Sequence, residues 1–296
     1  MSNDLPLLSF GGPYGNLEAT LAMLREVKQL GIPDDRVVCT SDVVAYCADP
    51  VATVELVRRS GIRVVMGNCE ESLGFDAGDC GCGFAEGSEC DLLSAAWYAH
   101  AARELDSASR AWMRSLPRSI DVSLGGRRLK VVHGSPGEIN RFVFASTPPE
   151  AKARELEVVD CDGIIAGHCG LPFTQIIADR LWHNPGAVGM PANDGTPRVW
   201  FSVLTPQSNG VRIEHRSLDY DFQTAAVKIR RAKLPEAYAR ALATGRWPSC
   251  EILPEEERAA SRIPMKPEKL LWSRSTSVSA RSNEAADANR SAAEGG

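Results

Sequence analysis

The stretch LPLLSFGGPYGNLEAT, residues 5–20, joins an apolar run to a helix-like segment through a glycine-rich turn. The run Leu5–Phe10 has the length of a strand, and the segment Asn16–Leu30 has the apolar spacing of a helix. The same alternation continues with apolar runs at Arg36–Thr40 and Ile62–Met66 and a helical pattern at Pro50–Ser60. Strands that alternate with helices are typical of a largely parallel sheet, so the sequence predicts an α/β fold.

The pattern changes from Ser119 onward. Ile120–Leu124 and Arg127–Val132 flank the pair Gly125-Gly126, which predicts a hairpin because glycine adopts the positive φ angles of a tight turn. Further strands are predicted at Gly163–Ala166, Thr174–Ala178, Arg180–His183, Arg198–Leu204 and Val211–Ser217, and helices at Glu150–Glu157, Asp221–Lys233 and Pro235–Gly245. We therefore expect two sheets, with pairing that is at least partly antiparallel after Ser119.

The folded part of the chain is predicted to be one domain, residues 1–250. The alternation of elements ends after about Cys250, and we expect residues 251–296 to form a largely disordered tail. The stretch Ser273–Gly296 is rich in Ser, Ala, Asn, Glu and Arg, so it cannot bury enough apolar surface to offset the entropy of ordering.

The composition of the whole chain narrows the class of protein. With 296 residues, 44% hydrophobic content and a net charge of -5, it has the profile of a globular protein without the basic surface that binds nucleic acid. Met1–Leu8 lacks the pattern of a signal peptide, and no stretch reaches the roughly 20 apolar residues of a membrane helix. We therefore expect a cytoplasmic protein with neither nucleic acid nor a membrane as partner. Nine cysteines in such a protein indicate thiols or metal ligands more than a disulfide framework.

Polar residues suited to ligand binding follow five of the predicted strands. The five loops are Phe10–Asn16, Thr40–Val44, Met66–Glu71, Val132–Pro136 and Ala166–Phe173. Open α/β sheets bind their ligands at the carboxyl ends of strands. Each loop alone is weak evidence, because a single Asp or His at a strand end is more often a structural group than a ligand. Taken in order, the five loops predict one common site.

These loops together resemble the pattern of the calcineurin-like metallophosphoesterases: Asp-x-His, Gly-Asp, Gly-Asn-His-Asp/Glu, His and Gly-His-x-His. The resemblance covers about residues 5–245, and the stretches Asn184–Pro191 and Tyr220-Asp221 are similar to the bacterial YfcE-like and ApaH-like branch. The family implies an α/β fold, a two-sheet sandwich flanked by helices. It also implies two metal ions and the hydrolysis of phosphate esters.

The sequence departs from the family at one of the two ion positions. The ligands of the first ion correspond to Gly12, Tyr14, Asp42 and Gly170, of which only the aspartate that bridges the two ions is retained. The ligands of the second ion correspond to Asp42, Asn68, His133 and His168, and all four are present. The resemblance therefore implies one divalent metal ion. Imidazole, carboxylate and amide ligands suit zinc, iron or manganese without choosing among them.

Cysteines surround the predicted site. Cys69 stands where the family has the histidine that protonates the leaving group. Cys80, Cys82 and Cys90 lie in an insertion that begins beside it, and Cys169 follows His168. These five cysteines are candidates for additional thiolate ligands, because thiolates bind soft metals well. The alternative is an ordinary insertion with buried thiols, since free cysteine is among the most buried residue types.

The sequence thus predicts a metal-dependent hydrolase of small phosphate esters, in which Asp42, His133 and Cys69 are the candidate catalytic residues. A single zinc ion can lower the pKa of a bound water to about 7, so hydrolysis remains feasible with one ion. Two alternatives stay open. The cysteines could rebuild the lost position into a metal or redox centre, or the protein could be a binding or regulatory homologue without catalysis. The sequence leaves the substrate and the oligomeric state open.

Overall fold

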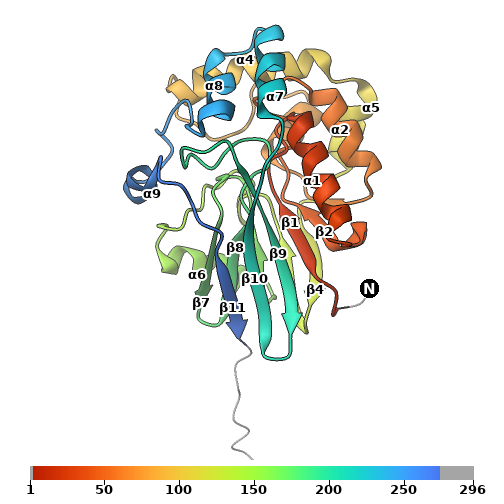
Figure 1. Ribbon diagram of the computed structural model, residues 1–296, viewed down its shortest axis with the longest axis vertical. Helices are drawn as coiled ribbons and strands as arrows, with labels where there is room; N and C mark the ends of the chain where they lie inside the picture. The colour runs from red at the N-terminus through yellow and green to blue at the C-terminus, as the bar shows by residue number, and fades with distance from the viewer. Residues whose placement is uncertain (1–2, 274–296) are drawn as a thin grey trace, which may run out of the picture.

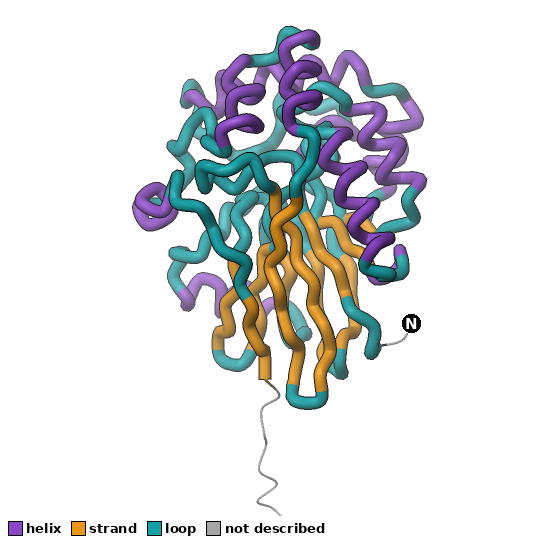
Figure 2. The backbone as a smooth tube through the Cα atoms, viewed as in Figure 1, coloured by secondary structure: helices purple, strands orange, loops and turns teal. Residues whose placement is uncertain are grey.

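The structure of the protein is a computed structural model, which describes residues 3–273. Two sheets make up its centre, as Figures 1 and 2 show. The first sheet has the order β11 (Lys269–Ser273), β10 (Gly210–Leu218), β9 (Val199–Gln207), β1 (Leu7–Phe10), β2 (Val37–Cys39) and β3 (Arg63–Val64). The second has the order β4 (Ile120–Leu124), β5 (Arg127–Val131), β6 (Gly163–Ile165), β8 (Arg180–Asn184) and β7 (Phe173–Ile177).

Helices lie around the sheets. They are α1 (Leu17–Gln29), α2 (Pro50–Arg59), α3 (Asn68–Gly74), α4 (Glu89–Glu104), α5 (Ser107–Ser115), α6 (Pro149–Val158), α7 (Phe222–Arg231), α8 (Glu236–Thr244) and α9 (Glu255–Ala260), with a 3-10 turn at Asp34–Arg36. Figure 1 shows α1 and α2 beside the first sheet, and α4, α7 and α8 gathered beyond the upper ends of the strands. The prediction of an α/β fold with two sheets flanked by helices is confirmed.

The direction of the strands decides where the loops go. β1, β2 and β3 run parallel in the first sheet, and β5, β6 and β8 run parallel in the second. The inner faces of both sheets share one apolar cluster, which contains Leu7 and Leu204 from the first sheet and Leu129 and Leu181 from the second. Because the carboxyl ends of parallel strands meet at one edge of a sheet, the loops after these strands converge.

The predicted hairpin is present, since β4 and β5 pair antiparallel across Gly125 and Gly126. The fold also extends past the boundary predicted at residue 250. Helix α9 follows that boundary, and β11 adds an antiparallel edge strand to β10. Trp272 of β11 is 2% exposed and joins the cluster between the sheets, so this segment is part of the core. The expected tail beyond Ser273 lies outside the described residues.

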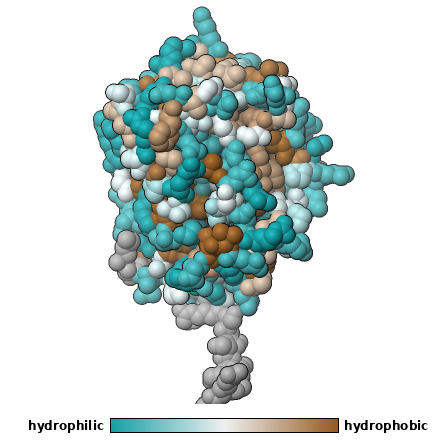
Figure 3. Space-filling model, turned by 180° about the vertical axis from the view of Figure 1, so that it is seen from behind, coloured by the Kyte–Doolittle hydropathy of each residue, from teal (hydrophilic) through white to brown (hydrophobic). Residues whose placement is uncertain are grey.

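The surface of the described part of the chain carries both polar and apolar side chains. None of its helices is long and apolar enough to cross a membrane. The large exposed apolar side chains, such as Phe75, Leu92, Val158 and Ile263, come from separate segments of the chain. Figure 3 shows hydrophobic residues in small groups between hydrophilic ones on the face turned away in Figure 1. Scattered apolar residues of this kind are normal for a folded surface.

Candidate metal centre

Four polar side chains from separate loops converge at the carboxyl edge of the two sheets. Asp42 follows β2, Asn68 follows β3, His133 follows β5 and His168 follows β6. One oxygen of Asp42 and one ring nitrogen of each histidine lie within 4.8 Å of one another. The four residues predicted from the sequence to hold an ion therefore come together in space.

The His133 ring is the centre of this group. Its Nδ1 lies 2.7 Å from the carbonyl oxygen of Thr40, which can only accept, so Nδ1 carries the proton. Its Nε2 faces Asn68 Oδ1 at 2.9 Å, His168 Nδ1 at 3.0 Å and Asp42 Oδ2 at 3.3 Å. In neutral His133 this nitrogen bears a lone pair, as do the facing oxygen atoms of Asn68 and Asp42. Lone pairs crowded at one point, without protons between them, fit a cation in their midst.

Burial and mutual charge set the protonation of the group. Burial would raise the pKa of Asp42, but the neighbouring His133 more than offsets it, so this pKa lies below its ordinary value. Burial would lower the pKa of His133, yet attraction to Asp42 raises it. Burial, and then repulsion from His133, lowers the pKa of His168 to about 3. At neutral pH Asp42 is therefore an anion and His168 a neutral imidazole, the forms in which both bind a cation.

Glu70 holds the loop that carries Asp42. Ser41 and Asp42 have left-handed backbone φ values of 79° and 56°. The fully buried Glu70 carboxylate accepts hydrogen bonds from the N–H groups of Asp42 (3.1 Å), Val43 (2.8 Å), Val44 (3.3 Å) and Gly67 (3.2 Å), and from the Ser41 hydroxyl. The sequence reasoning missed this residue. The sequence feature that could have predicted its role is its position as the third residue of α3, where a glutamate side chain reaches back to the backbone at the start of the helix.

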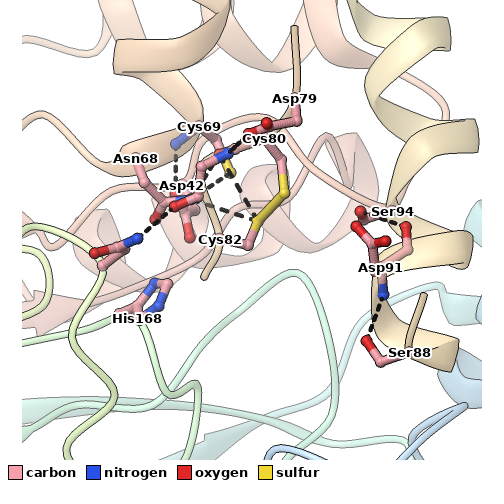
Figure 4. The surroundings of a disulfide bond; sticks show 12 residues. Asp42, Asn68, Cys69, Asp79, Cys80, Cys82, Ser88, Asp91, Ser94 and His168 are labelled. Atoms are coloured by element: carbon pink, nitrogen blue, oxygen red, sulfur yellow. Dashed lines mark hydrogen bonds between the residues drawn. A yellow bond between two sulfur atoms is a disulfide. The ribbon is translucent and has the colours of Figure 1, made fainter. Parts of the chain in front are cut away.

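The amide of Asn68 connects the group to the cysteine-rich loop. Its nitrogen donates to the carbonyl oxygen of Cys80 at 2.9 Å, and lies 3.4 Å from Cys82 Sγ and 3.5 Å from Cys69 Sγ. Cys80 and Cys82 form a disulfide, which Figure 4 shows beside Asn68, Cys69 and Asp42. These two cysteines therefore carry no thiolate in this structure, contrary to the ligand role expected of them.

The other cysteines lie at the margins of the site. Cys69 is 1% exposed and does not line the pocket described below; burial raises its pKa well above the ordinary value. Burial raises the pKa of Cys169 to about 12, and its sulfur accepts a hydrogen bond from Asn184. Cys90 is half-buried and lies beside Ser249 at the pocket. The leaving-group role predicted for Cys69 gains no support from this placement.

The positions predicted to have lost an ion also lie together. Gly12, Tyr14 and Gly170 are neighbours, and the ring of Tyr14 lies directly over Gly12. Tyr14 is 6% exposed and borders the same pocket as Asp42 and His168. The sequence reasoning treated these positions only as losses, because nothing in the chain order shows which way the tyrosine points.

The group opens into a cavity of about 80 Å³ whose lining includes six aromatic residues. The aromatic residues are Tyr14, Tyr46, Phe84, Phe142, Tyr238 and Trp247. Asp42 and His168 also line it, whereas no lysine or arginine does within the described part of the chain. Arg141, which follows the His133 loop in sequence, is paired with Glu155 at 2.8 Å.

Known proteins are similar to this chain over most of its length. Residues 15–208 match the calcineurin-like phosphoesterase superfamily domain. An uncharacterized protein from Methanocaldococcus jannaschii is 26% identical over 251 residues, which cover 79% of this chain and 95% of that one.

Two crystal structures share the fold. A hypothetical protein from Pyrococcus horikoshii OT3 has a TM-score of 0.68 and 19% identity, over 82% of this chain and 99% of that one. A metallophosphoesterase from Sphaerobacter thermophilus has a TM-score of 0.63 and 23% identity, over 82% of this chain and all of that one. At these identities the two structures support the architecture, and the family assignment rests on the matched domain.

Proposed function

The chain belongs to the calcineurin-like phosphoesterase superfamily, and from that premise we propose that it is a metal-dependent phosphoesterase that works with one ion. The observation that carries the proposal is the convergence of lone pairs from Asp42, Asn68, His133 and His168 on one point. A divalent ion held there would polarise a phosphoryl oxygen and make a water more acidic.

The residues of the chain prepare this site for the ion. The carbonyl oxygen of Thr40 fixes the tautomer of His133, so that Nε2 faces the site as a lone pair. Glu70 holds the backbone that aims Asp42, and the loop carbonyl of Cys80 orients the amide of Asn68. Because the four side chains come from different strand ends, the sandwich itself fixes their spacing.

The substrate we propose is a small phosphodiester with an apolar or aromatic group. A diester bears one negative charge, which a single divalent ion can balance. A polyphosphate carries several charges, for which cationic side chains are the usual partners, and the described pocket lining has none. Aromatic walls also bind flat apolar groups well. Placement in the bacterial YfcE-like or ApaH-like branch stays a prediction from sequence.

Turnover of chromogenic esters tests the proposal. The purified protein, loaded separately with zinc, iron or manganese, is assayed with an aryl phosphodiester, an aryl phosphomonoester and inorganic pyrophosphate. We expect metal-dependent hydrolysis that favours the diester, and its loss in His133→Ala/His168→Ala. His100→Ala is the matched control, because His100 bonds the carbonyl oxygen of Ala48 away from the pocket. Absence of metal-dependent turnover with every ester would contradict the proposal.

A second candidate is a redox function, which the disulfide beside Asn68 favours. Cys80 and Cys82 are bonded to each other, and the Cys69 sulfur approaches the same amide nitrogen. In the reduced protein, thiolates at these positions would be soft metal ligands. Metal content and turnover are therefore to be compared before and after reduction, in wild type and in Cys80→Ser/Cys82→Ser. Equal metal content and turnover in all four samples would eliminate a redox role. A ligand that the protein holds tightly and returns unchanged would instead indicate a binding protein.

A further inference from the structure

Tyr14 occupies a space that only two glycines leave open. A Cβ atom on Gly12 would lie 2.2 to 2.7 Å from the Tyr14 ring, which is far inside van der Waals contact. A Cβ atom on Gly170 would lie 3.5 Å from the Tyr14 hydroxyl, in van der Waals contact with it, and the φ of 71° at Gly170 favours glycine. The three residues therefore form one structural unit, in which two absent side chains make room for one phenol.

The backbone and the neighbouring rings hold the phenol in this place. Tyr14 has a left-handed φ of 53°, which is rare for a bulky residue and persists only where the surroundings enforce it. Its N–H donates to the carbonyl oxygen of Asp42 at 3.0 Å, so the loop of Tyr14 is attached to the loop of the metal centre. The ring packs edge-on against Tyr46 at 4.9 Å between centroids.

The hydroxyl of Tyr14 is a polar group without a bonded partner. It makes no hydrogen bond with any residue between 3 and 273, although the residue is 6% exposed. It borders the pocket that Asp42 and His168 also line. The hydroxyl oxygen is not cut off from the pocket, so a molecule bound there can accept its hydrogen bond. The natural partner here is an oxygen atom of a ligand in the pocket.

We propose that the Tyr14 hydroxyl donates a hydrogen bond to a non-bridging phosphoryl oxygen of the ester bound at the metal centre. This inference rests on the proposed function and assigns a further catalytic residue to it. The phenol makes and breaks no covalent bond; it stays protonated and stabilises negative charge that grows on the phosphoryl oxygen. Since the described lining offers no lysine or arginine for that charge, a fixed neutral donor has a large effect.

Tyr14→Phe tests the inference, because it keeps the ring and removes only the hydroxyl. We expect kcat for an aryl phosphodiester to fall about 100-fold, as for the loss of one donor to a developing oxyanion, with metal content unchanged. The loss should be equal for aryl diesters whose leaving phenols differ in acidity. Tyr98→Phe is the matched control, since the Tyr98 hydroxyl donates to the carbonyl oxygen of Ala77 and does not line the pocket.

Binding of inorganic phosphate to the metal-loaded protein supplies a readout besides turnover. We expect Tyr14→Phe to bind phosphate about tenfold more weakly than wild type and Tyr98→Phe to bind it equally. The inference is overturned if Tyr14→Phe keeps the wild-type kcat and phosphate affinity, or if it loses metal. It is also overturned if the loss of kcat grows with the pKa of the leaving phenol, because Tyr14 would then be a proton donor to the leaving group. A wild type that binds phosphate through Tyr14 without hydrolysing any ester would contradict the proposed function alone.

Discussion

At the scale of single residues, left-handed backbone conformations gather at the metal centre. Tyr14, Ser41, Asp42 and His168 all have φ values between 53° and 79°. Each costs about 1 kcal/mol or more for a residue other than glycine, so other contacts must enforce it. Glu70 does this for Ser41 and Asp42 through the hydrogen bonds of its buried carboxylate. The strain is a reason to regard these loops as selected for geometry.

Removal of the Glu70 carboxylate should therefore release the Asp42 loop. We expect Glu70→Ala to lower the free energy of unfolding by about 3 kcal/mol, because several buried N–H groups lose their acceptor. The neighbouring Glu71→Ala, which removes an exposed ion pair with Arg118, should cost less than about 1 kcal/mol. Urea unfolding of both variants measures the difference. Equal effects would mean that Glu70 does not support the loop.

The contact between Gly12 and Tyr14 predicts a strong coupling between the two positions. Gly12→Ala should destabilise the protein because its Cβ would meet the Tyr14 ring at 2.2 Å. In a Tyr14→Ala background the clash is gone, and only the strain of the φ value of 44° remains. We expect a coupling free energy of about 2 kcal/mol from the double-mutant cycle. Additive effects would show that the ring moves freely out of the way.

The four candidate ligands could be predicted from the sequence because the loops that carry them, each after an apolar strand, together resemble the family pattern. Asp42, Asn68, His133 and His168 lie at the carboxyl ends of strands that run parallel, so topology brings them together. The direction of the Tyr14 ring has no such signal. It depends on two glycines, one of which is more than 150 residues away along the chain.

At the scale of elements, a buried chain of hydrogen bonds joins the two sheets. Ser202 of β9 bonds Ser9 of β1 at 2.7 Å and His183 of β8 at 2.6 Å. Thr174 of β7 then bonds His183 at 2.8 Å and His215 of β10 at 2.9 Å. This series of hydrogen bonds crosses between the sheets twice, so His183 belongs to the core between the sheets rather than to the pocket. Polar core positions of this kind fix the alignment of two packed layers.

Protonation of His183 or His215 in this series of hydrogen bonds should destabilise the two-sheet sandwich. Burial lowers the pKa of His215 from 6.5 to about 4, and burial and then His215 lower the pKa of His183 further. The fold therefore favours the neutral rings, and the unfolded chain takes up protons first. The stabilisation is complete above pH 6.5 and falls by about 3 kcal/mol for His215 alone as the pH drops toward 4.

Urea unfolding between pH 7 and 4 measures this loss. His215→Gln removes the titrating ring and should flatten the dependence, whereas Ser217→Ala on the same strand should leave it as in wild type. A His215→Gln variant with the full wild-type slope would place the titration elsewhere.

At the scale of the whole molecule, the first sheet is completed by a strand from the end of the described chain. β11 pairs with all of Gly210–Glu214, and the Trp272 indole donates to the carbonyl oxygen of Asp179 at 2.9 Å. Arg127 lies over the same indole at 3.9 Å. No clear sequence pattern predicts this strand, because its five residues, Lys269–Ser273, follow an irregular segment, residues 261–268. Edge strands of this length depend on the sheet that they join.

Truncation tests how much β11 contributes to the stability of the fold. A chain that ends at residue 250 should be about 3 kcal/mol less stable than one that ends at residue 273, chiefly because it loses the buried Trp272. Trp272→Ala in the full-length chain should reproduce most of that loss. Thermal and urea unfolding provide the comparison; if residues 1–250 are as stable as residues 1–273, the edge strand is dispensable.

The central claim is that Asp42, Asn68, His133 and His168 hold one metal ion, and metal titration of anaerobically purified, metal-free protein tests it most directly. Calorimetry should find one tight site per chain in wild type and in Cys80→Ser/Cys82→Ser, and none in His133→Ala/His168→Ala, with all three proteins folded by circular dichroism. A double-histidine variant that retains the wild-type stoichiometry and affinity would contradict the claim.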